Sequence, residues 1–508
     1  KAGVEISTSN GDIALGTDTP STGAVAITAA TTTNIADTNG DITLYGTATS
    51  QTGTTVKTIT SGDITVNGTL ETKDQNGEDN DAKVGDVQVL AAKGNIILTN
   101  TGNDVVNSSN AALVQNSEGN IDVTGNVIGA TTATLDGKEG HVNLTGNLTA
   151  KGGLAKIQGY DAAEATEDDN DGNITVKGNV VSDTDGVNIT TTNGDITVGT
   201  GTDAPGAVKA VKALEISTAG TGDVTVNGNL ETTDSTNGTV NVSAAEGKVS
   251  LTKAGNKAGT ETAATEVINS ANSVTVTASD KNGVENLGDI AIAGNVIGAT
   301  SVDIHTDRGD IQVGTGTETA QISAVKAGTS LNVATNTKGN VTVNGSLTTV
   351  STNNSTVGDV TVTATEGKVT LTKAGDATNV IDSGKDIVVT AINVVDPSNS
   401  KDEGDIDINS SLNAAGAVTV HAYKLDGTAS GTGDITLDGA VTAGTAVDIA
   451  ANTGNVTIGG TNASKVQAGT TLAVKTLTDG DVAVTGQLVT TGADASTVTV
   501  SAKEGSVP

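Results

Sequence analysis

One short acidic run contains residues that could bind a metal ion. The segment "EDDNDG" (residues 167–172) places carboxylates at Glu167, Asp169 and Asp171. Ca²⁺ in proteins is bound by about six to eight oxygens from carboxylates, carbonyls and water. A calcium loop of this kind closes with a bidentate Glu about five or six residues further on, but Lys177 stands in that region. The run is therefore a weak calcium candidate, a solvated turn is the favoured interpretation, and no other cofactor is expected.

Catalysis by histidine or by paired carboxylates is the second chemistry to consider. The chain has three scattered histidines without a recognisable partner spacing, His141, His305 and His421. Glycoside hydrolysis needs paired carboxylates in a cleft, and carbohydrate clefts usually carry aromatic platforms. The three tyrosines are isolated from one another, at Tyr45, Tyr160 and Tyr423. We predict that the protein is not an enzyme.

Composition restricts the shape of the hydrophobic core. The 508 residues include 65 Gly and 3 Tyr, but no Cys, Met, Trp or Phe. A rounded core of this size normally relies on aromatic side chains for much of its buried area. A core of Val, Ile, Leu and Ala alone indicates a thin core extended along one axis, as in a solenoid.

Charge and cysteine content exclude several classes of partner. The net charge of −33 disfavours nucleic acid and anionic membrane surfaces, because both require basic patches. No apolar run approaches the length that spans a membrane, so membrane insertion is not expected.

Lack of Cys rules out disulfides and thiolate metal sites. Lack of both Met and Cys suits an extracellular protein, because these are the most oxidation-prone side chains.

A short phrase recurs along the chain: Gly, then Asp or Asn, an aliphatic residue, a small polar residue and another aliphatic residue. It begins at Gly11, Gly40, Gly62, Gly85, Gly94, Gly119, Gly172, Gly194, Gly222, Gly288, Gly309, Gly339, Gly358, Gly404, Gly433, Gly454 and Gly480. Most copies are about 20–30 residues apart, which is the period of solenoid repeats. Gly allows the positive φ of a corner, and the alternation that follows directs Ile64 and Val66 inward and Thr65 outward.

Larger blocks repeat above this short period. Related sequence occurs at residues 55–104, 212–256, 328–376 and 470–505, whereas the segments between strands vary in length. We therefore predict one continuous β-solenoid over residues 1–508, all-β and without helices, with roughly twenty coils and a length on the order of 100 Å. Stacked Asp side chains at the corners would repel one another, so we expect them to be offset or interrupted by Asn. Neither end looks like a cap, which favours a segment of a longer chain.

These repeated phrases resemble the shafts of large bacterial surface adhesins. The pattern G-[D/N]-[I/V]-T-[V/L]-x-G in a Thr-, Gly-, Asn- and Val-rich chain is similar to filamentous haemagglutinin-like proteins of two-partner secretion and to autotransporter passengers. The resemblance covers essentially the whole chain. It implies a right-handed parallel β-helix that holds an adhesive region away from the bacterial cell surface.

Within such a family, the tripeptide Arg308-Gly309-Asp310 would suggest integrin binding. However, Gly309-Asp310 is also one of the repeat's own corners and continues directly into a strand. Integrin ligands usually present this tripeptide on a projecting loop, so a structural corner is the favoured interpretation.

The sequence predicts a structural, non-enzymatic extracellular shaft that supports attachment or biofilm formation. Its expected partners are flanking repeats or other copies end to end, and a host or neighbouring-cell surface contacted by regions outside this segment. The alternative is a self-assembling filament subunit that adds end to end through terminal β-strands, because an unpaired strand edge templates another strand.

Overall fold

The structure is a computed structural model. It describes residues 2–17, 25–73, 85–161, 172–200, 206–253, 266–280, 288–314, 323–349, 358–373, 378–393, 404–423, 431–459, 464–492 and 496–508. The chain divides into two compact units, Lys1–Ala245 and Glu246–Pro508. That the two units form one continuous solenoid stays a prediction from the sequence.

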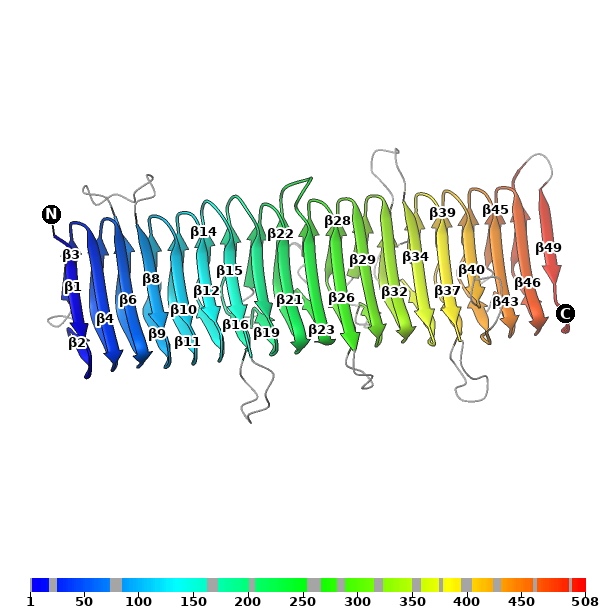
Figure 1. The fold of residues 1–508 in the computed structure, drawn as a ribbon. Coiled ribbons are helices and arrows are strands. Elements are labelled where there is room, and N and C mark those ends of the chain that lie inside the picture. The colour runs from blue at the N-terminus through cyan, green and yellow to red at the C-terminus, as the bar shows by residue number, and fades with distance from the viewer. Residues whose placement is uncertain are drawn as a thin grey trace. The chain divides into compact units, whose positions relative to one another are not determined.

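Each unit is a right-handed parallel β-helix, and the described residues contain no helix. Every strand pairs in parallel with the equivalent strand about one coil further along the chain. Figure 1 shows the strands of the first unit, blue to green, lying side by side in this order. The fold class predicted from the sequence is confirmed. One sheet, called sheet A below, has nineteen strands, which agrees with the roughly twenty coils expected.

Sheet A supplies one strand to each coil. In the first unit its strands are β1 (Val4–Thr8), β4 (Thr32–Asn39), β6 (Gly53–Ser61), β8 (Asp86–Ala91), β10 (Ala112–Asn116), β12 (Ala133–Gly137), β15 (Ala155–Gly159), β18 (Val187–Thr191) and β21 (Leu214–Thr221). Strand β23 (Val240–Gly247) includes the boundary between the units. In the second unit they are β26 (Val274–Asp280), β29 (Ser301–Arg308), β32 (Ser330–Lys338), β34 (Asp359–Thr365), β37 (Ile387–Ile392), β40 (Val418–Ala422), β43 (Val447–Thr453), β46 (Thr471–Asp479) and β49 (Thr497–Ser501).

Sheet B supplies the rest of each coil, as one long bent strand or as two short strands. In the first unit these are β2 (Ile13–Leu15), β3 (Val25–Ala29), β5 (Ile42–Ser50), β7 (Ile64–Thr72), β9 (Ile96–Ser108), β11 (Ile121–Gly129), β13 (Val142–Thr145), β14 (Leu148–Ala150), β16 (Ile174–Val176), β17 (Val180–Ser182), β19 (Ile196–Val198), β20 (Gly206–Ala210) and β22 (Val224–Thr232).

In the second unit the sheet B strands are β24 (Val249–Thr252), β25 (Glu266–Ser270), β27 (Ile290–Ala293), β28 (Asn295–Gly298), β30 (Ile311–Val313), β31 (Ser323–Ala327), β33 (Val341–Thr348), β35 (Val369–Thr372), β36 (Ile381–Ser383), β38 (Ile406–Ile408), β39 (Leu412–Ala414), β41 (Ile435–Leu437), β42 (Val441–Ala443), β44 (Val456–Ile458), β45 (Lys465–Ala468), β47 (Val482–Val484) and β48 (Gln487–Thr490).

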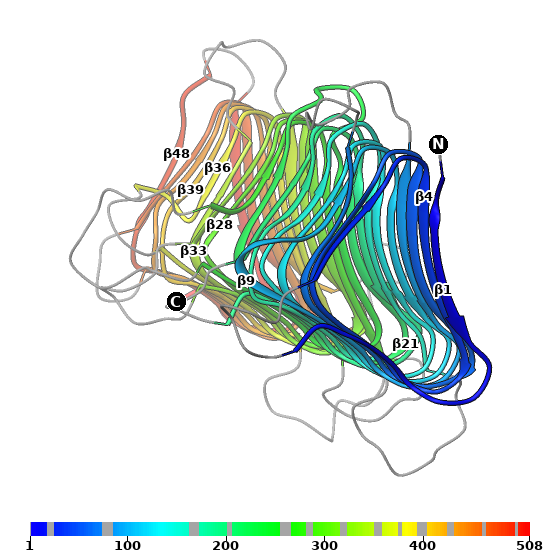
Figure 2. The same ribbon diagram turned by 90° about the vertical axis from the view of Figure 1, so that its left-hand side faces the viewer.

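A coil has three sides and two sharp corners that matter for the site. Strand β4 of sheet A ends at a first corner, Gly40-Asp41, after which β5 forms the two sides that belong to sheet B. A second corner, at residues 51–52, returns the chain to β6 in sheet A. Figure 2, seen from the N-terminal end, shows β1 and β4 on one side of the coils of the first unit.

The core consists of aliphatic side chains stacked in register. Ile42 pairs with Ile64, which pairs with Ile96, which pairs with Ile121, and none of the four is exposed. The predicted inward positions of Ile64 and Val66 and the outward position of Thr65 are confirmed. Burying each such side chain stabilises the fold by about 1.5–3 kcal/mol, so the stack of equivalent residues compensates for the absence of aromatic side chains.

Glycine is required at the first corner because successive coils are in contact there. A Cβ on Gly62 would overlap the carbonyl oxygen of Gly40, and one on Gly339 would overlap that of Gly309. Gly62 also has φ 129°, a conformation that other residues rarely adopt. The corner glycine is therefore fixed both by backbone conformation and by the coil before it.

We predict that Gly62→Ala destabilises the first unit much more than Gly102→Ala. Both glycines have positive φ, but a Cβ on Gly102 would meet no atom within 4 Å. Gly102→Ala therefore carries only the backbone cost of about 1–2 kcal/mol, whereas Gly62→Ala adds overpacking of about 1–3 kcal/mol or more. The measurement is the urea midpoint together with hydrogen exchange of the first unit. Equal losses in the two variants would contradict the steric explanation.

Candidate functional site

The first corners are joined by a ladder of side-chain hydrogen bonds. The backbone N–H of Asp41 donates to Asp12 Oδ1 at 3.1 Å, and that of Asp63 donates to Asp41 Oδ1 at 2.8 Å. The same contact, from acceptor to donor residue, links Asp63–Asn95, Asn95–Asn120, Asn120–His141, Asn173–Asp195 and Asp195–Asp223 in the first unit. In the second unit it links Asp289–Asp310, Asp310–Asn340, Asn340–Lys368, Asp405–Asp434, Asp434–Asn455, Asn455–Asp481 and Asp481–Ser506.

This ladder explains why the repeat uses Asp or Asn after the corner glycine. Both have a side-chain oxygen that reaches the backbone N–H of the next coil, which would otherwise lack an acceptor. The corner acids are thus in register and not offset. Asn residues interrupt the runs of Asp, which is one of the two arrangements that the sequence predicted. At Asp481 the backbone N–H and the hydroxyl of Ser506 both donate to the carboxylate and hold its pKa below the ordinary value.

A second row of polar side chains lies inside the same corners, at the end of the sheet A strands. Thr306 Oγ1 donates to the carbonyl oxygens of Gly288 and Arg308, at 2.6 and 2.9 Å. Asn116 Nδ2 donates to the Gly94 carbonyl oxygen at 2.6 Å. These buried donors pair with carbonyl groups that the strand ladders leave free.

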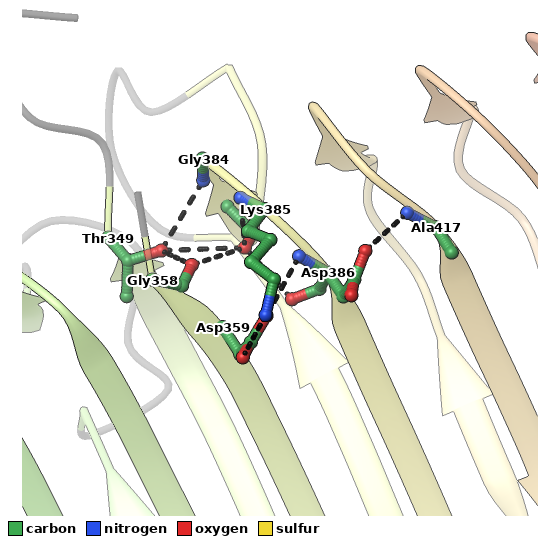
Figure 3. A network of polar contacts seen from close by, with 8 residues as sticks. Thr349, Gly358, Asp359, Gly384, Lys385, Asp386 and Ala417 are labelled. Atoms are coloured by element: carbon green, nitrogen blue, oxygen red, sulfur yellow. Dashed lines mark hydrogen bonds and ion pairs between the residues drawn. The ribbon is translucent and has the colours of Figure 1, made fainter. Parts of the chain in front are cut away.

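Buried hydroxyls perform the same task at the second corner, shown for the second unit in Figure 3. Thr349 Oγ1 and Ser383 Oγ both donate to the carbonyl oxygen of Gly358, at 2.6 and 3.0 Å. On the outer side of the corner, Asp359 Oδ1 accepts a hydrogen bond from the Asp386 backbone N–H at 3.2 Å. The other oxygen of Asp359 forms an ion pair with Lys385 Nζ at 3.0 Å. This corner is therefore hydrogen-bonded both from inside and from outside.

The tripeptide Arg308-Gly309-Asp310 lies in one of these corners. Arg308 is the last residue of β29, Gly309 has φ 128°, and Ile311 begins β30. Both the backbone N–H and the side-chain Nδ2 of Asn340 donate to the Asp310 carboxylate, at 2.8 and 3.1 Å. The tripeptide is therefore part of the ladder, and an integrin-type role stays a hypothesis that this arrangement does not support.

The calcium candidates Glu167, Asp169 and Asp171 lie outside the described residues. Within the part of the chain that the structure describes, no group of three or more His, Cys, Asp or Glu residues could hold a metal ion. In that same part, no helix is long and apolar enough to cross a membrane.

Two of the histidines have carboxylate partners on the outer surface. His141 Nε2 lies 3.3 Å from Asp122 Oδ1, and His305 Nδ1 lies 3.2 Å from Asp303 Oδ2. The hydrogen bond to Asp303 raises the pKa of His305, and the same bond lowers the pKa of Asp303. His305 lies on the outer face of β29, with its side chain 28% exposed.

His421 belongs to a cluster that sequence reasoning missed. Its Nε2 lies 3.0 Å from Asp448 Oδ2, and its ring stacks on Tyr423 with centroids 4.7 Å apart. Lys475 Nζ contacts the other Asp448 oxygen at 2.8 Å. Burial opposes ionisation of Asp448, but the hydrogen bonds from His421 and Lys475 prevail and lower its pKa. The three strands involved are about one coil apart, so only the stacking register brings these residues together.

Among the described residues, these arrangements position backbone and side chains. The three His–Asp contacts are on separate coils, and each uses the imidazole to bind one carboxylate. Comparison of the chain with protein-family models, with curated proteins and with solved structures found no match.

We predict that Asp63→Ala loosens the corner ladder while Asp63→Asn preserves it. Alanine removes the acceptor of the Asn95 backbone N–H, at a cost of about 1 kcal/mol. Asparagine keeps an acceptor oxygen and removes one charge from the run Asp12–Asp41–Asp63. Hydrogen exchange at the Asn95 amide should accelerate in the alanine variant only. Equal acceleration in both variants would show that charge, and not the acceptor, maintains the ladder.

We also predict that the imidazole of His305 titrates above the ordinary histidine pKa of ~6.5. Because this pKa is raised, its contribution to stability is present below pH ~6.5 and is lost as the pH rises through the raised value. The lowered pKa of Asp303 adds a contribution that is present above pH ~4 and lost as the pH falls.

An NMR titration of the histidine ring protons, assigned with His305→Gln, measures this pKa. Asp303→Asn should lower the His305 pKa, and Asp307→Asn, which removes a more distant charge, should lower it less. A His305 pKa that does not change in Asp303→Asn would contradict the assigned cause.

Proposed function

We propose that this chain is a structural, non-enzymatic shaft segment of an extracellular bacterial adhesin or fibre. In this role it holds an adhesive region away from the cell surface and supports attachment or biofilm formation. The adhesive contact itself belongs to regions outside these residues.

The observation that carries the proposal is the repetition of the same hydrogen bonds from coil to coil in each unit. Each corner carboxylate or amide binds the next coil, as Asp195 binds the backbone N–H of Asp223 at 2.8 Å. The stacked strands add their own backbone hydrogen bonds and their continuous aliphatic core. An element built this way transmits force along the stack through many equivalent contacts, as a shaft requires.

Composition supports an extracellular location. The chain has no Cys or Met to be oxidised, and a formal charge of −33 keeps a long repetitive surface soluble. The resemblance of the repeats to adhesin shafts agrees with this location.

The location and form can be tested on the source cells. Immunogold electron microscopy with antibodies against residues 1–508 should label thin extracellular fibres of fixed length, and surface proteolysis of intact cells should remove the label. Intracellular labelling that resists surface proteolysis would contradict the proposal. Filaments of indefinite length built from chains of limited mass would instead favour the end-to-end filament subunit.

The shaft role itself predicts tolerance to removal of whole coils. Asp195 and Asp223 occupy the same position in successive coils, so deletion of residues 196–223 joins Asp195 to Val224 in phase. The deletion should shorten the fibre by about 5 Å and leave cell attachment unchanged. A control deletion of residues 196–210 removes part of a coil and should disrupt the fibre. Loss of attachment by intact fibres in the in-phase variant would place the binding function in this coil instead.

A further inference from the structure

In several coils the inner row of the first corner carries a side-chain hydrogen-bond donor, whereas in others it carries Ala or Gly. Thr191 donates to the carbonyl oxygens of Gly172 and Asn193. Gly172 is the corner glycine of the preceding coil, and Asn193 directly precedes the corner glycine of Thr191's own coil. Thr306 makes the equivalent pair of contacts in the second unit. In both cases one hydroxyl donates to two inward carbonyl groups.

Asp37 occupies this position in its own coil. It lies three residues before the corner glycine Gly40, as Thr191 lies before Gly194. It is fully buried, and its strand neighbours in register are Thr8 and Thr58. When it is ionised, the Asp37 carboxylate has no proton to donate and cannot perform the task of the threonines.

Three oxygen atoms around Asp37 have no hydrogen-bond partner among the described residues. Asp37 Oδ1 accepts a hydrogen bond from the Asn39 backbone N–H at 3.1 Å, but Oδ2 is buried and unpaired. The hydroxyl oxygen of Thr58, a residue only 4% exposed, is also unpaired. No donor to the carbonyl oxygen of Gly11, the preceding corner glycine, is found in the described part of the chain.

Two of these oxygens converge on the Cα of Gly40. A Cβ placed on Gly40 would lie 2.7 Å from the Gly11 carbonyl oxygen and 2.9 Å from Asp37 Oδ2. Because Gly40 has no side chain, a carboxylate oxygen and a carbonyl oxygen both face the space that its Cβ would occupy, and neither has a hydrogen-bond donor among the described residues. A buried and unpaired charge of this kind is costly unless a counter-charge neutralises it.

We propose that Asp37 and the oxygens around it form a binding site for a small hard cation inside the first unit. Carboxylate, carbonyl and hydroxyl oxygens are the ligands that Na⁺ and Ca²⁺ prefer, and nitrogen or sulfur ligands are not involved. The negative charge of this one carboxylate neutralises the charge of a monovalent ion fully and that of a divalent ion by half. The cation replaces the proton that a threonine supplies in other coils and joins the coils of β1, β4 and β6. This site is separate from the acidic run at residues 167–172.

The test uses hydrogen exchange of the whole chain, with tetramethylammonium chloride as a reference salt that is too large to enter the site. Protein dialysed into this salt is compared with protein in NaCl and in CaCl₂ at equal ionic strength. In the cation that binds, amides of residues 37–41 should exchange about tenfold more slowly. Protection by NaCl alone or by CaCl₂ alone would support the site and identify its ion. Equal exchange in all three salts would overturn the proposal, because a buried water or a proton would then satisfy Asp37.

Three variants separate this site from general screening of a highly charged protein. Asp37→Thr introduces the residue found at the equivalent position of other coils, and Asp37→Asn provides an amide donor, as Asn116 does towards Gly94. Both should exchange slowly in all three salts. Asp41→Asn removes the same charge from an exposed corner residue and should keep the response to the cation. A cation response that persists in Asp37→Thr would also overturn the proposal.

Discussion

The close approach of one coil to the next at the first corner is the constraint on which the rest of the structure depends. Strands in a sheet are about 4.8 Å apart, so the corners of successive coils lie within this spacing of one another. Only glycine leaves room for the preceding carbonyl group, as at Gly62 above Gly40. The residue after the glycine then finds its backbone N–H directed at the preceding coil, and an Asp or Asn oxygen accepts it. The repeated dipeptide is therefore the smallest unit that closes one coil onto another.

A stack of such corners brings Asp carboxylates close together, and Asn and Lys residues reduce the resulting repulsion. Asp12, Asp41 and Asp63 are in register, so like charges lie about one strand spacing apart. Each carboxylate accepts a backbone N–H, and asparagine follows at Asn95 and Asn120. Lysines pair with acids on neighbouring coils at the outer surface, as Lys368 does with Asp407. Asp37 lies inside the coil, where one of its carboxylate oxygens is buried without a hydrogen-bond partner among the described residues, unlike the hydroxyls of Thr191 and Thr306 in the same row.

The histidine clusters show how a repetitive fold brings together residues that are far apart in the sequence. His421 and Asp448 are 27 positions apart in the sequence, yet equivalent strands place them in contact. Tyr423 covers the imidazole ring, and burial followed by the negative charge of Asp448 raises the pKa of its hydroxyl. Among the described residues, no group of three or more His, Cys, Asp or Glu residues that could hold a metal ion is found here.

The sequence by itself determined the parallel β-helix, the inward direction of residues such as Ile64 and Val66, and the corner position of Gly309. These follow from local rules: alternation sets the face of a strand, and glycine allows the backbone conformation of a tight corner. Tertiary structure alone decided which residues of adjacent coils become neighbours. Loops of variable length separate the repeats, so the sequence does not show which residue of one coil lies opposite which residue of the next. The contact of His421 with Asp448, the acceptor role of Asp63 towards Asn95, and the burial of Asp37 beside Gly11 all depend on that register. The reason is physical: each of these contacts joins adjacent coils, and only the packing of the aliphatic core fixes how one coil lies on another.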